Sequence, residues 1–209
     1  MDFVFQLKFV ALYISIFTAA FHLPGDAILS NIHHSRIENT SSYPADNYIG
    51  KIIDRYNNIP VFYNGNTSNV SGRTMTADGY NLGLKYQCVE FVKRYYYKVF
   101  DHKMPNSYGH AKDFFDLSLD DGALNTERDL LQFQNGSSYH PQKDDILIFD
   151  GHERNEFGHT AIIMHVSENE CIYIQQNVGT KTREKLKIYT ANEKYYLASK
   201  DILGWLRMK

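Results

Sequence analysis

The sequence predicts an α+β fold in which N-terminal helices pack on an antiparallel sheet. Apolar residues recur at a four-residue spacing between Val89 and Phe100, which is the period of a helix face. After Pro141 the pattern becomes extended, with turn residues between short apolar runs. Helices followed by strands are the order of an α+β domain, because the helices can then cover one side of the sheet.

The composition indicates one globular domain. The chain has 209 residues, enough for a sizeable core, and 43% of them are hydrophobic and 22% charged. The net charge is −2, and Lys and Arg are spread along the chain, so no nucleic-acid partner is predicted. The two cysteines, Cys88 and Cys171, are too few for a disulfide scaffold or a structural zinc site. They either stay free or pair with each other, and pairing would block Cys88 as a nucleophile.

The N-terminal segment resembles a targeting signal. Its apolar run, residues 9–21, has the length of a signal-peptide core and is short for a membrane span. Lys8 is the only basic residue before the run, and Asp2 offsets its charge. We expect residues 1–28 to be an export signal or a membrane anchor; the alternative is a hydrophobic helix lying on the domain.

This segment sets the expected boundaries and location. Residues 29–47 are polar and are predicted to be a linker, so the domain is expected to span residues 48–209. An export signal would make the protein secreted, periplasmic or membrane-anchored. If the apolar run is not an export signal, the protein is expected to be cytoplasmic.

The elements follow from local pattern, in chain order. The residues before Pro141 predict helices at 48–56, 89–100, 111–119 and 126–133, with an extended stretch at 59–63 and a loop at 64–78. Thr126 and Asp129 resemble a capping box that opens the last helix. The residues after Pro141 predict strands at 145–150, 159–166, 171–177, 185–190 and 202–208.

Cys88 is the candidate nucleophile. It stands where a glycine-containing loop becomes the first turn of the helix that begins near Val89. Unpaired backbone N–H groups and the positive end of the helix dipole favour an anion there, so a thiol in that place has a lowered pKa. The alternative is that Cys88 is a small buried hydrophobic residue, which is common for a free cysteine.

His159 is the candidate base. It follows Gly158 and opens a predicted strand, so its ring is both accessible and held by a rigid element. His152 and His165 are the competing histidines. A turn at 167–170 joins this strand to the next as an antiparallel hairpin, and pairing His165 with Cys171 would place Ala161 opposite Gln175.

That register puts His159, Gln175 and Asn177 on one face of the hairpin. Either amide oxygen could then accept the imidazole N–H and orient the ring. A shift of one residue in register would move Gln175 to the other face.

These residues carry a resemblance to the CHAP amidase/peptidase family, in particular to the amidase domains of glutathionylspermidine and trypanothione synthetase/amidases. It rests on the YQCVEF string at 86–91, Gly158-His159, the segment 175–178 and the closing segment 202–205, and it extends from about residue 48 to 207. The resemblance implies a papain-like fold with Cys88 as nucleophile and His159 as general base.

The resemblance also marks two departures. Gln175 stands where the family usually has a glutamate, which implies a slower enzyme because an amide stabilises an imidazolium less than a carboxylate does. Lys93, with Arg94 beside it, takes the place of a family arginine near the site. We group Lys93, Arg94 and Asn177 with the expected substrate contacts.

The sequence therefore predicts cysteine-dependent amide hydrolysis without a metal or cofactor. Cys88 attacks the carbonyl carbon, and its backbone N–H, with Gln87 or Asn81 as a second donor, holds the oxyanion. The expected substrate is a small peptide amide, a glutathionylspermidine-type peptide–polyamine conjugate. Murein peptides are the alternative substrate, and a catalytically weak binding domain is the alternative to an enzyme.

Overall fold

The structure is a computed structural model, and it describes residues 48–209. The predicted export signal or anchor at 1–28 and the predicted linker at 29–47 lie outside the described residues. Within the described part, no helix combines the length and the apolar character that crossing a bilayer requires.

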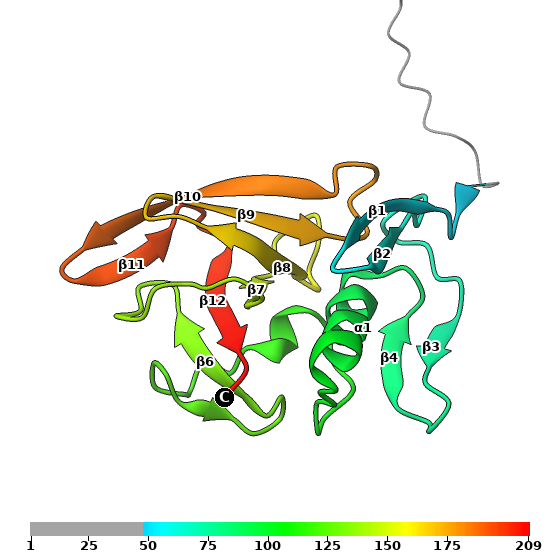
Figure 1. The fold of residues 1–209 in the computed structure, drawn as a ribbon, viewed down its shortest axis with the longest axis horizontal. Helices are drawn as coiled ribbons and strands as arrows, with labels where there is room; N and C mark the ends of the chain where they lie inside the picture. Colours follow the sequence, from blue (N-terminus) through cyan, green and yellow to red (C-terminus); the bar gives the residue numbers. More distant parts are fainter. Residues whose placement is uncertain (1–47) are drawn as a thin grey trace, which may run out of the picture. The chain divides into compact units, whose positions relative to one another are not determined.

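An eight-stranded antiparallel sheet forms most of the domain (Figure 1). Its order is β11-β10-β9-β8-β7-β12-β6-β5, so the last strand lies between β7 and β6. The strands are β5 (Leu124–Asn125), β6 (Leu130–Gln134), β7 (Ile146–Phe149), β8 (His159–Val166), β9 (Glu170–Gln175), β10 (Arg183–Ala191), β11 (Lys194–Leu197) and β12 (Ile202–Arg207).

One α-helix, α1 (Cys88–Phe100), occurs in residues 48–209, and it packs against β8. Two antiparallel hairpins precede it in the chain and lie beside it in Figure 1. Their strands are β1 (Ile52–Tyr56) with β2 (Ile59–Phe62), and β3 (Arg73–Met75) with β4 (Asn81–Leu84). A single 3-10 turn, η2 (Lys112–Phe114), follows the helix.

Backbone conformation fixes both ends of α1. Tyr86 has a φ of 67° and Gln87 is extended, so the chain turns sharply into the helix at Cys88. Asp101 is left-handed, and its N–H donates to the Tyr96 carbonyl to close the last turn. The helix predicted from the four-residue spacing is therefore confirmed, with Phe91 fully buried on its core-facing side.

Both faces of the central strands are buried. Ile146, Ile148 and Ile162 contact the helix side of the core, whereas Leu147 and Ala161 belong to a second cluster. Alternate residues of β7 and β8 thus point to opposite faces, as the period of a strand requires. Burial on two sides holds β8, and with it His159, in a fixed position.

The prediction of several N-terminal helices is wrong. Residues 52–56 of the first predicted helix form β1, residues 130–133 of the last belong to β6, and the segment 111–119 contains only η2. β6 pairs with β12, where Phe133 lies opposite Trp205, and this pairing prevails over the weak helical spacing. Asp129 has a φ of 53°, so no helix runs through the predicted capping box.

The predicted strands after Pro141 are confirmed, with small changes at their ends. Ala161 lies opposite Gln175, as the hairpin register requires. An irregularity between Ile163 and His165 places His165 opposite Ile172 instead of Cys171. The error therefore falls at the turn end of the hairpin, and the pairing at the other end is the predicted one.

Candidate active site

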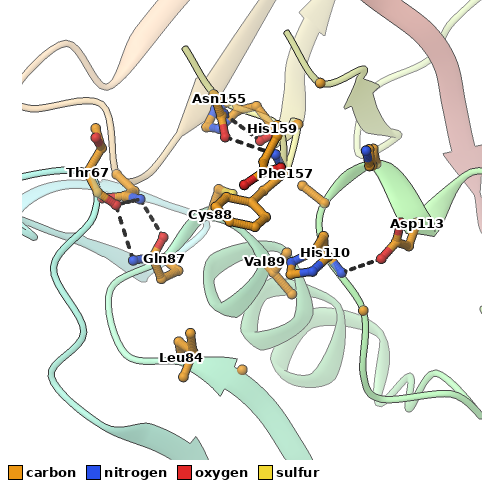
Figure 2. A pocket seen from close by; sticks show the side chains of 18 of the residues that line it. Thr67, Leu84, Gln87, Cys88, Val89, His110, Asp113, Asn155, Phe157 and His159 are labelled. Carbon is orange, nitrogen blue, oxygen red and sulfur yellow. Dashed lines mark hydrogen bonds between the residues drawn. The ribbon is translucent and has the colours of Figure 1, made fainter. Parts of the chain in front are cut away.

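Cys88 occupies the first position of α1 and faces a cavity (Figure 2). Only 8% of the residue is exposed, and no side chain caps this helix end. Both cysteines are free, so the disulfide alternative is wrong. Burial raises the pKa of the Cys171 thiol to about 12, which makes it an unreactive core residue.

His159 is the first residue of β8, opposite Phe149 of β7. Gly158 before it has a φ of 73°, and a side chain there would meet the Phe149 carbonyl oxygen and Lys112. The glycine therefore allows the chain to enter β8 at the angle that aims the imidazole toward α1. His152 also lines the cavity, whereas His165 lies exposed toward the far end of β8.

The Cys88 thiol and the His159 ring face each other (Figure 2). Burial alone would raise the pKa of the thiol, but the charge of His159 and a hydrogen bond with it lower that pKa below its ordinary value. Burial alone would lower the pKa of His159, but the charge and hydrogen bond of Cys88 raise it. Both changes favour a thiolate–imidazolium pair, the reactive form of a cysteine nucleophile.

Gln175, the last residue of β9, holds the other side of the imidazole. Nε2 of His159 lies 2.9 Å from the Gln175 side-chain oxygen. An amide oxygen only accepts, so Nε2 carries the hydrogen and Nδ1 is left for Cys88. Gln175 is 3% exposed, which keeps water from competing for this bond.

Thr160 also contacts Cys88. Its backbone N–H and hydroxyl both lower the pKa of the thiol. The hydroxyl is buried and has no hydrogen-bond partner. A thiolate at Cys88 would supply the missing acceptor. Sequence reasoning did not identify Thr160, although its place directly after the histidine was a signal.

Gln87 and Asn177 lie at the cavity but hydrogen-bond to each other and to a loop. Asn177 Nδ2 donates to the Gln87 side-chain oxygen at 2.5 Å and to the Thr67 carbonyl at 2.9 Å. Gln87 Nε2 donates to the carbonyl oxygens of Thr67 and Asn69, at 3.3 Å and 2.8 Å. The donors of Gln87 are thus used by the loop that covers this side of the cavity.

Asn81, Lys93 and Arg94 are not among the residues that line the cavity. Asn81 Nδ2 donates to the Ser107 carbonyl at 2.9 Å, so the amide is not available to an oxyanion. Lys93 is fully buried, and its ammonium donates to the carbonyls of Asn81 and Ser107. Burial lowers the pKa of Lys93 to about 7.

Arg94 belongs to a buried network of hydrogen bonds next to the site. It pairs with Glu90 at 2.6 Å, one turn along α1, and donates to the Pro60 carbonyl at 2.8 Å. Gln176 joins this pair, because its Nε2 donates to Glu90 and to the Gln87 carbonyl, both at 3.0 Å. The network ties the start of α1 to the end of β9, and therefore Cys88 to Gln175. The sequence analysis did not predict this network, because Glu90 and Arg94 are distant in sequence from Gln176.

The cavity has a volume of about 1460 Å³ and runs past Cys88 and His159. Its lining carries charges of both signs. The carboxylates come from Asp113, Glu153 and Glu156, and the cations from Arg73, Lys112 and Arg154.

Part of the chain matches a known protein family. Residues 77–177 match the CHAP domain. Trypanothione synthetase of Crithidia fasciculata is 27% identical over 57% of this chain and 18% of its own length. The bifunctional glutathionylspermidine synthetase/amidase of Escherichia coli is 31% identical over 60% of this chain and 22% of its own. The chain thus spans about a fifth of the length of these relatives.

Among solved structures, that of Ly7917 covers 34% of this chain and 30% of its own at 18% identity, with a TM-score of 0.24. This likeness is too low to bear on function. The matched segment 77–177 contains Cys88, His159 and Gln175, the three side chains that the structure brings together. The candidate active site therefore lies within the residues that match the CHAP domain.

Proposed function

We propose that this protein is a cysteine-dependent amide hydrolase that cleaves peptide–polyamine conjugates of the glutathionylspermidine type. The observation that carries the proposal is the placement of the buried Cys88 thiol beside the His159 ring (Figure 2), whose Nε2 is held by Gln175. A nucleophile, a base and a residue that orients the base are the three parts of thiol catalysis.

In this mechanism the Cys88 thiolate attacks the carbonyl carbon of the scissile amide, and the carbonyl oxygen becomes an oxyanion. Nδ1 of protonated His159 gives its proton to the nitrogen, the C–N bond breaks and the amine leaves. His159 then takes a proton from water, which attacks the thioester, and the acid product leaves with Cys88 restored.

We assign the oxyanion to the backbone N–H groups at the start of α1. The Cys88 N–H is the first of the helix and has no partner within it. Gln87 can add a second donor only after its amide leaves the carbonyls of Thr67 and Asn69. The loop around Thr67 therefore has to shift if Gln87 takes part.

The substrate class rests on two supports. One relative is named a bifunctional glutathionylspermidine synthetase/amidase. The cavity also carries three carboxylates, Asp113, Glu153 and Glu156, which suit a polyamine cation. Three cationic side chains line it as well, Arg73, Lys112 and Arg154, so the lining as a whole is mixed in charge. A specific observation favours murein peptides as the second candidate: the apolar run at 9–21 resembles an export signal, and export would bring the domain to a cell wall.

The test uses the full chain with glutathionylspermidine and, separately, with murein peptide fragments. We expect spermidine release by the wild type and none by Cys88→Ala. Cleavage of murein alone would overturn the substrate class and leave the hydrolase. Cleavage of neither, with an unreactive Cys88, would favour the binding-domain alternative.

A further inference from the structure

The Gln175 amide is held by a carboxylate on the next strand. Its Nε2 donates to the Lys181 carbonyl at 3.1 Å and to Glu184 Oε1 at 3.3 Å, while its oxygen faces His159. Turning the amide over would set its oxygen against two other oxygens and its NH₂ against the imidazole N–H. These neighbours therefore select one orientation of Gln175.

Glu184 is placed for this contact by the sheet register. It lies on β10 opposite Tyr173, two residues before Gln175 on β9, so the two side chains share a face. The Glu184 side chain is 32% exposed and pairs with Lys181 at 3.1 Å. It is thus a partly buried carboxylate one hydrogen bond beyond the amide that orients His159.

We propose that Glu184 is a positioning residue of this active site, which holds the Gln175 amide with its oxygen toward His159 and supplies through it the negative charge that the amide lacks. The proposal rests on the proposed function, because it assigns His159 to proton transfer with Cys88. It also explains how an amide can stand where the resemblance expects a glutamate: the carboxylate is displaced by one side chain.

The electrostatics of the site agree with this role. The charge of Glu184 raises the pKa of His159, together with the larger effect of Cys88 and the hydrogen bond to Gln175. The charged and titratable groups around the Glu184 carboxylate are Lys181, which precedes it in the chain, Tyr173 on β9 and His159 on β8. Lys181 is 72% exposed, so solvent weakens its opposing effect.

The test compares Glu184→Gln with Glu170→Gln in the full chain. Glu170 is the matched control, because it also pairs with a lysine, Lys185 at 3.2 Å, and does not contact Gln175. The readouts are the NMR titration of the His159 ring and kcat for amide cleavage. We expect Glu184→Gln to lower the pKa of His159 and to lower kcat about tenfold with little change in KM, and Glu170→Gln to change neither.

A double variant distinguishes the loss of the Glu184 charge from a general structural effect of the substitution. In Gln175→Glu/Glu184→Gln the carboxylate and the amide exchange places, so the hydrogen bond between them can be kept while the charge moves beside His159. We expect this variant to recover the pKa of His159 and the kcat that Glu184→Gln loses. No recovery, or a Glu184→Gln titration that matches the wild type, would overturn the proposal.

The two claims fail in different ways. If the wild type cleaves an amide and Glu184→Gln behaves like Glu170→Gln, the positioning role is wrong and the hydrolase stands. If no amide is cleaved but Glu184→Gln still lowers the pKa of His159, the proposed function is wrong and the structural role of Glu184 stands.

Discussion

The side-chain oxygen of Gln175 accepts a hydrogen bond of 2.9 Å from Nε2 of His159. This bond joins the ends of two neighbouring strands, and it leaves Nδ1 of the ring for Cys88 on the helix. Gln175 on the sheet therefore orients the imidazole, and Cys88 on the helix raises its pKa. The chemistry that we assign to the domain depends on this arrangement.

Replacing His159 with alanine removes the largest of the effects that lower the pKa of Cys88. We expect the rate of iodoacetamide alkylation of Cys88 at about pH 6 to fall ~100-fold, because the thiol then stays protonated. Amide cleavage should be lost with it, since the general acid and base is gone. His165→Ala is the control, because this exposed histidine of the same strand does not contact Cys88. Equal effects of the two variants would contradict the assignment of His159.

The Thr160 hydroxyl should matter only when Cys88 is a thiolate. Thr160→Val keeps the shape of the side chain and removes a hydroxyl that lowers the pKa of Cys88. We expect the midpoint of the alkylation profile to move to higher pH, and Thr160→Ser to stay near the wild type. A Thr160→Val profile that overlays the wild type would show that the hydroxyl plays no part.

Gly158 should be intolerant of a side chain. A Cβ there would press on the Phe149 carbonyl oxygen and lie 2.9 Å from Lys112 Cβ, at a φ of 73°. We expect Gly158→Ala to lower the free energy of unfolding by about 3 kcal/mol, the sum of backbone strain and the clash.

Gly79→Ala supplies the control for that change. Gly79 has a φ of 83°, and no atom beyond its two chain neighbours lies within 4 Å of the position that an alanine Cβ would take. Only the backbone strain of about 1 kcal/mol therefore applies. Urea denaturation measures both variants. A loss at Gly158 no larger than at Gly79 would mean that the approach of Phe149 is not as close as described.

The Asp54–Arg183 pair ties β1 to β10 and predicts a pH-dependent stability. Hydrogen bonds from Arg183 lower the pKa of Asp54 from 3.8 to about 2, so the unfolded carboxyl binds a proton more tightly than the folded one. The contribution of this pair to the free energy of unfolding is therefore complete above about pH 4 and is lost as the pH falls toward 2.

Asp54→Asn should accordingly cost about 1 kcal/mol near neutral pH, a value reduced by the solvent exposure of Arg183. At about pH 2 the variant and the wild type should unfold at the same urea concentration. A deficit that stays constant across this range would assign the effect to packing and not to the ion pair.

The parts of the fold that could be predicted depend on local pattern. The helix from Val89 follows from its apolar spacing, and the hairpin of β8 and β9 follows from two strands and a short turn. The predicted register placed Gln175 on the same face of the hairpin as His159. Side chains alternate between the two faces of a strand, so few pairings of these strands bury both Ala161 and Ile163.

The parts that could not be predicted depend on distant contacts. Residues 130–134 form a strand because β12, some seventy residues later, lies beside them. Asn81 and Lys93 lie near Cys88 in sequence, but their polar atoms bond to Ser107 and not to the cavity. Glu184 reaches Gln175 only through the pairing of β9 with β10, which no motif marks.

The most direct test of the account is the pH profile of Cys88 alkylation by iodoacetamide in the full chain, with Cys88 and Cys171 resolved by mass spectrometry. The account predicts that at about pH 6 Cys88 reacts much faster than free cysteine, while buried Cys171 stays unmodified. A Cys88 that reacts no faster than free cysteine at this pH would contradict the claim that His159 activates it.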